Sequence, residues 1–443
     1  MNFKLRTVCL ALGLSLSTSA AYADDLLQIY QVALTKDPVL LQADSNRDAA
    51  YERIGQTRAN LLPQINASLS YSDVLDNSVP GSPGGNPADS EVSSTSGAIT
   101  LSQSIYDHAN YVNLGITKQS AAQSELNYDL VKQSLIVRVA QAYFNVLSAQ
   151  DNVEFVLANK RAIERQLEQT KQRFAVGLTA ITDVHEAQAQ FDLAVANEIT
   201  AQNNLDNNFE ALREITGIAH QELNVLDTER FSPSKPAPAS ADQWQTIAED
   251  SSINLLINRL SVEIAKEQIN LARTGHMPSI SFSAQYGDTF SHDRNFLEGD
   301  STNIGVNVSI PIFAGFRVTG QVDEAKANYV VAQQSLEESY RSVVRNTRAS
   351  LNNVNASLGS IRAYEQSVVS AESALKATEA GFEVGTRTIV DVLNSTQQLY
   401  SAKQQLADAR YGYIISILTL KQAAGTLSDA DLEMINKGLR SAS

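Results

Sequence analysis

The sequence predicts an α+β membrane protein built from two tandem copies of one unit, each a pair of strands joined to a long helical hairpin. Three observations predict this class. Motifs recur at nearly constant distances, four short stretches alternate apolar and polar side chains, and the stretches between them have the pattern of long helices. Helices of this length do not belong in a compact soluble domain; they build a bundle or a tube.

The first 23 residues have the composition of a secretory signal. A positively charged start precedes an apolar stretch from Val8 to Leu16, and Ala21-Tyr22-Ala23 is an A-x-A cleavage site. The mature chain is therefore expected to begin at Asp24. Its loss of Cys9, the only cysteine, excludes disulfides, cysteine-bound zinc and cysteine nucleophiles.

The composition is acidic, with a formal net charge of −15 that becomes −17 when the two basic residues of the signal are removed. An acidic chain is a poor ligand for nucleic acid, whose phosphates attract lysine and arginine. No stretch after the signal reaches the length of apolar sequence that a transmembrane helix needs. The exported chain is therefore expected to be periplasmic, secreted, or a β-barrel of the outer membrane.

Two copies of one unit follow the signal. Leu62-Pro63-Gln64-Ile65 recurs 215 residues later as Met277-Pro278-Ser279-Ile280. Phe174-Ala175-Val176-Gly177 recurs 208 residues later as Phe382-Glu383-Val384-Gly385. The change in offset indicates that the loops of the two strand pairs differ in length. Self-similarity of this kind identifies a tandem repeat.

The repeat sets the expected domain boundaries. We expect a signal at residues 1–23, a first repeat at residues 24–231, a proline-rich seam at residues 232–240 and a second repeat at residues 241–443. Each repeat begins with a helix. In the first repeat, strands at about 63–73 and 97–107 and a helical hairpin at about 109–217 are expected to follow. In the second repeat, the expected elements are strands at about 278–288 and 302–313, a helical hairpin at about 317–425 and a short C-terminal segment.

The first long helix has an uninterrupted sequence. Between Gly115 and Gly177 lie 61 residues without glycine or proline. Apolar residues there recur at alternating spacings of four and three, which is the pattern of a coiled-coil seam. A helix of this length measures roughly 90 Å at 1.5 Å per residue. The seam residues are Leu135, Val139, Ala142, Val146, Ala149, Val153 and Val156.

The four expected strands alternate apolar and polar residues, as strands between lipid and a watery lumen do. In the first of them, Ile65, Leu69 and Tyr71 are separated by polar residues. The same pattern would suit a soluble sandwich about equally well. Only four strands are expected and the rest of the chain is helix, which favours the membrane over the sandwich. Four strands leave open edges that lipid does not tolerate, so other copies of the chain must close the barrel. Eight strands from a dimer and twelve from a trimer both satisfy this requirement.

The loops within the strand pairs fix the orientation. They run from Val74 to Ser96 and from Asp288 to Thr302, and both are long and polar. Barrel strands are joined by longer loops outside the cell, so the helices are expected to extend into the periplasm.

Several motifs resemble those of the TolC family of outer-membrane efflux channels. The matching stretches are Arg47 to Ala50 (RDAA), Ala142 to Leu147 (AYFNVL), Val384 to Val392 (VGTRTIVDV) and Ala409 to Tyr411 (ARY). The resemblance covers essentially the whole mature chain. It implies a homotrimer with a 12-stranded β-barrel in outer-membrane lipid and a periplasmic α-barrel of long helices, closed at its inner end.

The resemblance also implies a function. The chain is expected to be a passive exit duct of a tripartite efflux system for drugs, bile salts and detergents, and also to serve type I protein secretion. A periplasmic adaptor and an inner-membrane pump or secretion transporter are the implied partners. The alternative is a structural or adhesive coiled-coil protein with a small membrane anchor, but trimeric adhesins collect their strands at the C-terminus instead of interrupting the chain twice.

No motif for catalysis, metal or cofactor binding is found. His185-Glu186 begins an H-E-x-x-H motif, but Ala189 occupies the position of the second histidine. The glycines between Gly81 and Gly85 lack the lysine of a phosphate-binding loop. The chain is therefore expected not to be an enzyme, and the energy for transport must come from a partner.

The resemblance places the adaptor-contacting tips at the turns of the two helical hairpins. A glycine directly after a long helix also has a simpler explanation, because a left-handed C-terminal cap requires it. That explanation accounts for the glycines but not for a Thr-Arg-Thr sequence at an exposed tip. The tip residues are Val176, Gly177, Leu178 and Thr179 in the first repeat and Val384, Gly385 and Thr386 in the second.

Asp391 matches a residue that faces the pore axis in the family. Three copies would form a pore constriction ring whose carboxylates repel, raise one another's pKa and attract cations. The family has a second acid one turn later, where this chain has Asn394. We therefore expect one acidic ring and weaker binding of blocking cations. Asp391 and its counterpart Asp183 would also each favour a helix start through the helix dipole.

A gate lock is implied at the same end. Arg387 matches the family's donor, with Thr182 and Asp183 as acceptors, and an arginine–carboxylate bond is of the strong kind. A family tyrosine that supports the lock is Phe382 here. Since Phe174 mirrors Phe382 in the first repeat, simple packing explains it better. The gate is therefore expected to open slightly more easily.

Overall fold

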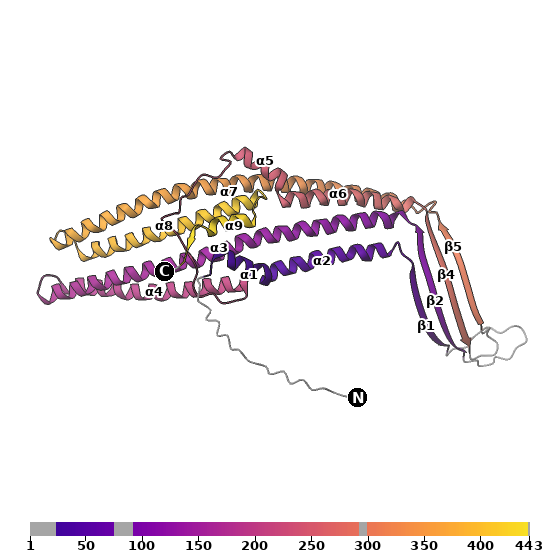
Figure 1. Ribbon diagram of the computed structural model, residues 1–443, viewed down its shortest axis with the longest axis horizontal. Helices are drawn as coiled ribbons and strands as arrows, with labels where there is room; N and C mark the ends of the chain where they lie inside the picture. Colours follow the sequence, from indigo (N-terminus) through magenta and orange to yellow (C-terminus); the bar gives the residue numbers. More distant parts are fainter. Residues whose placement is uncertain (1–23, 75–91, 292–298, 442–443) are drawn as a thin grey trace, which may run out of the picture.

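The molecule is elongated, with a shaft of helices that ends in a sheet (Figure 1). The computed structural model describes residues 24–74, 92–291 and 299–441. The expected signal at residues 1–23 lies outside the described residues. None of the described helices combines the length and the apolar character needed to cross a membrane.

Two hairpins of long helices form the shaft. Hairpin 1 consists of α3 (His108–Ala175) and α4 (Ile181–Thr216), and hairpin 2 of α7 (Arg317–Glu383) and α8 (Ile389–Ala423). With 68 and 67 residues, α3 and α7 run most of the length of the molecule. The hairpins meet mainly through α3 and α8.

The coiled-coil spacing of α3 forms the middle of the main core. Leu135, Val139 and Val146 are fully buried, and Ala142 and Ala149 are nearly so. Val153, further toward the tip, is half-buried. Tyr143 and Phe144 lie beside this seam, and the ring of Phe144 stacks on Tyr411 of α8 with 5.6 Å between centroids. The seam therefore joins the two hairpins as well as the two helices of hairpin 1.

Shorter elements pack along the shaft, from its middle toward the sheet (Figure 1). Helices α2 and α6 continue the hairpins toward the sheet, beside the long arms of α3 and α7, and the others pack around the middle. These elements are α1 (Leu26–Lys36), α2 (Pro38–Ala59), β3 (Val225–Leu226), α5 (Ala241–Ser251), α6 (Ile253–Arg273), the 3-10 turn η1 (Thr274–His276), α9 (Asp429–Asn436) and β6 (Leu439–Arg440).

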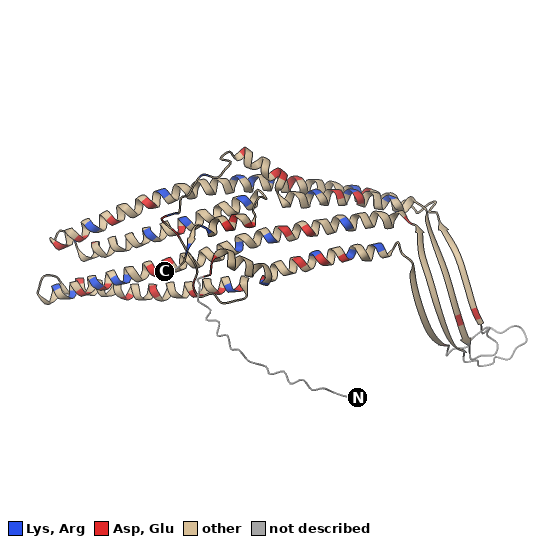
Figure 2. Ribbon diagram, viewed as in Figure 1, with Lys and Arg blue, Asp and Glu red and all other residues tan. Residues whose placement is uncertain are grey.

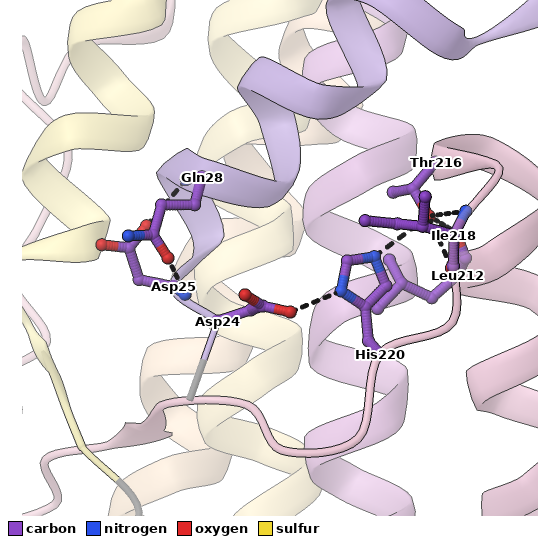
Figure 3. Close-up of polar contacts among 7 residues, drawn as sticks. All are labelled: Asp24, Asp25, Gln28, Leu212, Thr216, Ile218 and His220. Carbon is purple, nitrogen blue, oxygen red and sulfur yellow. Dashed lines mark hydrogen bonds and ion pairs between the residues drawn. The ribbon is translucent and has the colours of Figure 1, made fainter. Parts of the chain in front are cut away.

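A clasp, formed by Asp24, Thr216 and His220, fastens the beginning of α1 to the end of hairpin 1 (Figure 3). The buried ring of His220 has Nδ1 2.7 Å from Asp24 Oδ2 and Nε2 3.0 Å from Thr216 Oγ1. The backbone reinforces this contact, because Asp24 N donates to Glu222 O at 3.0 Å and Asn224 N donates to Asp24 O at 3.1 Å.

We expect His220→Ala to release the clasp and destabilise the protein by about 1–3 kcal/mol, because both hydrogen bonds of a buried ring are lost. The measurement is thermal unfolding of the purified protein, followed by circular dichroism. His185→Ala, on the exposed surface of α4, is the matched control. Equal unfolding temperatures for the two variants would contradict a stabilising role for the clasp.

The four long strands form one antiparallel sheet in the order β1-β2-β4-β5. Its register places apolar residues of all strands in common rows: Ile65 pairs with Leu101, Leu101 with Ala284, and Ala284 with Ile304. Ile65 and Ile304 are 72% and 71% exposed. One face of the sheet is thus apolar and uncovered within the protomer. The strands are β1 (Gln64–Val74), β2 (Val92–Tyr106), β4 (Ser279–Ser291) and β5 (Gly299–Ser309).

Charge is distributed unequally between shaft and sheet (Figure 2). The helices carry both signs along their length, whereas the four strands carry no lysine or arginine. The strands' only acids are Asp73, Asp288 and Asp300, all near the loop end. The central part of the sheet is therefore free of charge, as a lipid-facing surface must be.

The strands end at other residues than the alternation suggested. β2 begins at Val92, inside the stretch expected as loop, because its serines and threonines pair with β1 up to Val74. β4 and β5 likewise extend to Ser291 and back to Gly299. At the helix end β5 stops at Ser309, two residues before Pro311, whose missing N–H cannot continue a ladder.

Candidate functional site

Residues 176–180 form the tip of hairpin 1, farthest from the sheet. Gly177 adopts a left-handed φ of +74°, and Leu178 N donates to Arg173 O at 2.8 Å to close the end of α3. Val176 is 70% exposed. The Asp183 carboxylate turns back into this tip, where it accepts from the Thr179 hydroxyl. Asp183 is therefore engaged within its own turn.

Residues 384–388 form the tip of hairpin 2 on the same plan. Gly385 has φ +79°, and both the backbone N and the Oγ1 of Thr386 donate to Gly381 O, at 2.8 and 3.1 Å. Val384 is 76% exposed. Around Gly177 and Gly385 alike, a Cβ would meet no heavy atom within 4 Å. The left-handed backbone at both tips is one that glycine adopts without strain.

Asp391 lies in the first turn of α8, where Thr388 caps the helix. Thr388 donates from both its backbone N and its Oγ1 to Asp391 Oδ2, each at 2.9 Å, and Asp391 N donates back to Thr388 Oγ1 at 3.3 Å. The two hydrogen bonds from Thr388 hold the pKa of Asp391 below its ordinary value, and the nearby positive charge of Arg387 lowers it further by a smaller amount. Asn394 is exposed one turn later. Within one protomer, Asp391 is therefore a stabilised carboxylate.

The structure does not bring the expected lock together within one protomer. Among the described residues, no hydrogen bond or ion pair joins Arg387 to Thr182 or Asp183. Instead the stem of Arg387 lies over Gly381, where a Cβ would come within 2.7 Å of Arg387 Cγ. Gly381 was not expected from the sequence. Comparison of the two repeats could have found it, because Gly381 stands where the first repeat has Arg173.

Phe382 packs against a small core that joins the hairpins near their tips. The guanidinium of Arg173 lies 4.7 Å from the centroid of its ring. Arg173 has no signal in the sequence that separates it from other helix-terminal arginines. The buried members of this tip core are Ile163 and Leu167 from α3, Ala187 and Ala194 from α4, and Ile389, Val392 and Leu393 from α8.

A shaft of long hairpins that carries an apolar sheet with an uncharged centre at one end and exposed turns at the other defines an outer-membrane channel. The family model of outer membrane efflux proteins matches the chain twice, at residues 29–218 and 246–426. The chain belongs to this family, the outer membrane efflux proteins that include TolC. The two matches also confirm the tandem repeat.

Relatives support the same assignment along the full chain. The outer membrane protein TolC of Vibrio cholerae is 46% identical, over 99% of this chain and 99% of that protein. TolC of Escherichia coli is 44% identical, over 98% of this chain and 89% of that protein. The alkaline protease secretion protein AprF of Pseudomonas aeruginosa is 30% identical, over 94% and 87%.

Solved structures share the fold at low sequence identity. The outer membrane channel CmeC of Campylobacter jejuni has a TM-score of 0.77 at 19% identity and covers 99% of this chain and 98% of that chain. The outer membrane protein VceC of Vibrio cholerae has a TM-score of 0.73 at 21% identity, over 90% and 96%. The chain is thus an efflux channel of the outer membrane with a periplasmic helical part, and it is not an enzyme.

Proposed function

We propose that the chain forms a homotrimer that serves as the passive exit duct of a tripartite efflux system. The observation that carries this proposal is the sheet. Its rows of apolar side chains cross all four strands, and among the described residues of the protomer no strand pairs with the outer edge of β1 or of β5. Three such sheets joined edge to edge give a 12-stranded barrel without free edges, which is the condition for a stable sheet in lipid.

The partners belong to the same proposal. A passive duct needs an energised inner-membrane pump, and a periplasmic adaptor that reaches the exposed tips around Val176, Leu178 and Val384. Drugs, bile salts and detergents are the proposed cargo. Similarity to the protease secretion protein AprF favours type I protein secretion as a second use. Residues 1–23 are proposed to be removed on export, which leaves a mature chain without cysteine.

A strain that lacks this chain tests the proposal directly. We expect such a strain to become sensitive to bile salts, detergents and dyes, and a plasmid copy of the chain to restore tolerance. Secretion of a protease exported by a type I transporter is measured in the same strains. Wild-type tolerance of all three compound classes in the deletion strain would reject the efflux duct.

The gate is proposed to close by contacts between protomers at the tips. Arg387 does not reach Thr182 or Asp183 of its own protomer, so its proposed acceptors are those residues of the neighbouring protomer. Asp391 and Asn394 are proposed to line the constriction. Since Thr179 already donates to Asp183, a lock with Arg387 would use the remaining acceptor capacity of that carboxylate.

Arg387→Ser is expected to raise the open probability of single channels in planar bilayers, because each of three protomers loses a charge-assisted hydrogen bond. Arg362→Ser, an exposed position of α7 remote from the tip, is the matched control and should behave as wild type. Phe382→Tyr tests whether a hydroxyl restores the weaker closing bond and should reduce spontaneous opening. An unchanged open probability in Arg387→Ser would remove the lock.

A further inference from the structure

Arg173 contacts hairpin 2 of its own protomer beside the apolar tip core. It lies in the last turn of α3, while Phe382 lies in the last turn of α7. The guanidinium is 4.7 Å from the centroid of the Phe382 ring. A planar guanidinium over a ring face is attracted by the negative charge of that face. The contact thus adds a directed link between hairpins to the apolar tip core.

The surroundings of Arg173 favour this contact over an ordinary ion pair. Within the described part of the chain, no carboxylate lies within 4.0 Å of its guanidinium. Its side chain is half-buried, and so is that of Phe382. A cation that has no acid partner and is partly desolvated is attracted to an aromatic ring more strongly than a fully exposed cation is.

The repeat shows that this contact is specific to one pair of positions. Phe174 is the counterpart of Phe382, yet it is 42% exposed and has no cation over its ring among the described residues. Gly381 is the counterpart of Arg173 and leaves room for the stem of Arg387. The two hairpins have therefore diverged. Hairpin 1 supplies the cation of the contact, Arg173, and hairpin 2 supplies the ring, Phe382.

We propose that Arg173 is a positioning residue of the closed channel, which fastens hairpin 1 to hairpin 2 through the ring of Phe382. The inference rests on the proposed function and adds that the tips of hairpins 1 and 2 separate within a protomer when the duct opens. In this chain the Arg173–Phe382 contact opposes separation within a protomer, while the Arg387 lock opposes it between protomers. Phe382 thereby contributes to closure without a hydroxyl group.

Arg173→Gln, which keeps most of the stem but removes the charge, is expected to shift the closed–open equilibrium toward open. A cation–π contact of this exposure corresponds to about a threefold change per protomer, and three protomers multiply to about 30-fold. Phe382→Leu should have a similar effect, and Arg173→Lys should recover part of the closure. The readout is single-channel open probability in planar bilayers.

Two control variants and a double variant make the test specific. Phe174→Leu removes the mirror ring, and Arg165→Gln removes an exposed charge two turns earlier on α3; both should behave as wild type. Arg173→Gln combined with Phe382→Leu should open no further than either single variant, because both changes remove one contact. Additive effects in the double variant would overturn the proposal, since a merely structural role for each residue predicts them.

A distance measurement separates this proposal from the proposed function. Because the mature chain has no cysteine, spin labels can be placed at Val176 and Val384 alone. Pulsed electron paramagnetic resonance should show a broader tip-to-tip distance distribution in Arg173→Gln than in Arg165→Gln. If Arg387→Ser opens the channel while Arg173→Gln changes neither conductance nor distances, the Arg173 link is wrong and the duct stands. If the wild-type protein forms no pore in bilayers, the duct itself fails, whatever the distances show.

Discussion

Asp391→Asn is expected to weaken block of the open channel by a trivalent cation by about 100-fold or more. In the proposed trimer, three carboxylates close to one axis would attract such a cation strongly, even when water screens them. The variant removes all three charges at once and keeps side-chain size. Block is measured as the cation concentration that halves single-channel current. Asp192→Asn, an exposed acid of α4 that belongs neither to the proposed constriction nor to the proposed lock, is the control and should change the block much less.

Asn394→Asp is the reciprocal change and should tighten the same block, because it adds a second ring one turn from Asp391. An Asp391→Asn channel that blocks like wild type would show that Asp391 does not face the pore. An Asn394→Asp channel that blocks no better would place Asn394 away from the axis. The two variants thus test the two positions independently.

The pH dependence of block follows from the Thr388 cap. Only ionised Asp391 attracts the cation, and the hydrogen bonds from Thr388 lower its pKa. The three carboxylates of the proposed ring raise one another's pKa, and the hydrogen bonds from Thr388 act against that repulsion. They should therefore let block persist to a lower pH than it would without them. Thr388→Val removes the hydroxyl donor, raises the pKa of Asp391, and should shift the loss of block to higher pH. An identical pH profile for Thr388→Val and wild type would contradict this cause.

Gly425→Ala is expected to destabilise the protein by about 2–5 kcal/mol, from a left-handed alanine and from overpacking. Gly425 has φ +74°, and a Cβ there would lie 2.9 Å from Ser252 Cα and closer still to the Ser251 carbonyl. These are backbone atoms at the junction of α5 and α6, so no side chain can rotate away. The loss is measured as a lower thermal unfolding temperature.

Gly217→Ala is the matched control in the first repeat. Gly217 has nearly the same backbone conformation, φ +70°, but its nearest neighbour, Lys36 Cβ, is 3.9 Å away. Only the left-handed strain remains there, about 1–2 kcal/mol. If Gly217→Ala unfolds at a lower temperature than Gly425→Ala, the close approach at Ser252 is not what fixes Gly425.

The sequence predicts the architecture well because the architecture is periodic. The alternating spacing around Val139 and Val146 reports a buried seam directly, and the offset between the two copies reports the repeat. The ends of β2 and β5 were less accurately predicted. Serine and threonine outside the lipid have no apolar alternation to mark a strand, so hydrogen bonding to β1 alone decides where β2 begins.

The candidate site was predicted less completely, for a different reason. Helix caps such as Gly177 and Gly385 depend on neighbours within a few residues, so the sequence shows them. The contact of Arg173 with Phe382 joins residues more than two hundred positions apart and has no periodic pattern. The lock of Arg387 has its proposed acceptors on another chain, so the fold of one protomer cannot complete it.

The unpaired edges of β1 and β5 have a genetic consequence. If three chains must complete one sheet, each finished channel contains three chains drawn at random from those that the cell makes. In a cell that makes normal and edge-defective chains in equal amounts, only about one channel in eight would contain normal chains alone. A defect confined to either edge should thus be dominant over the normal gene, whereas loss of the whole chain should be recessive.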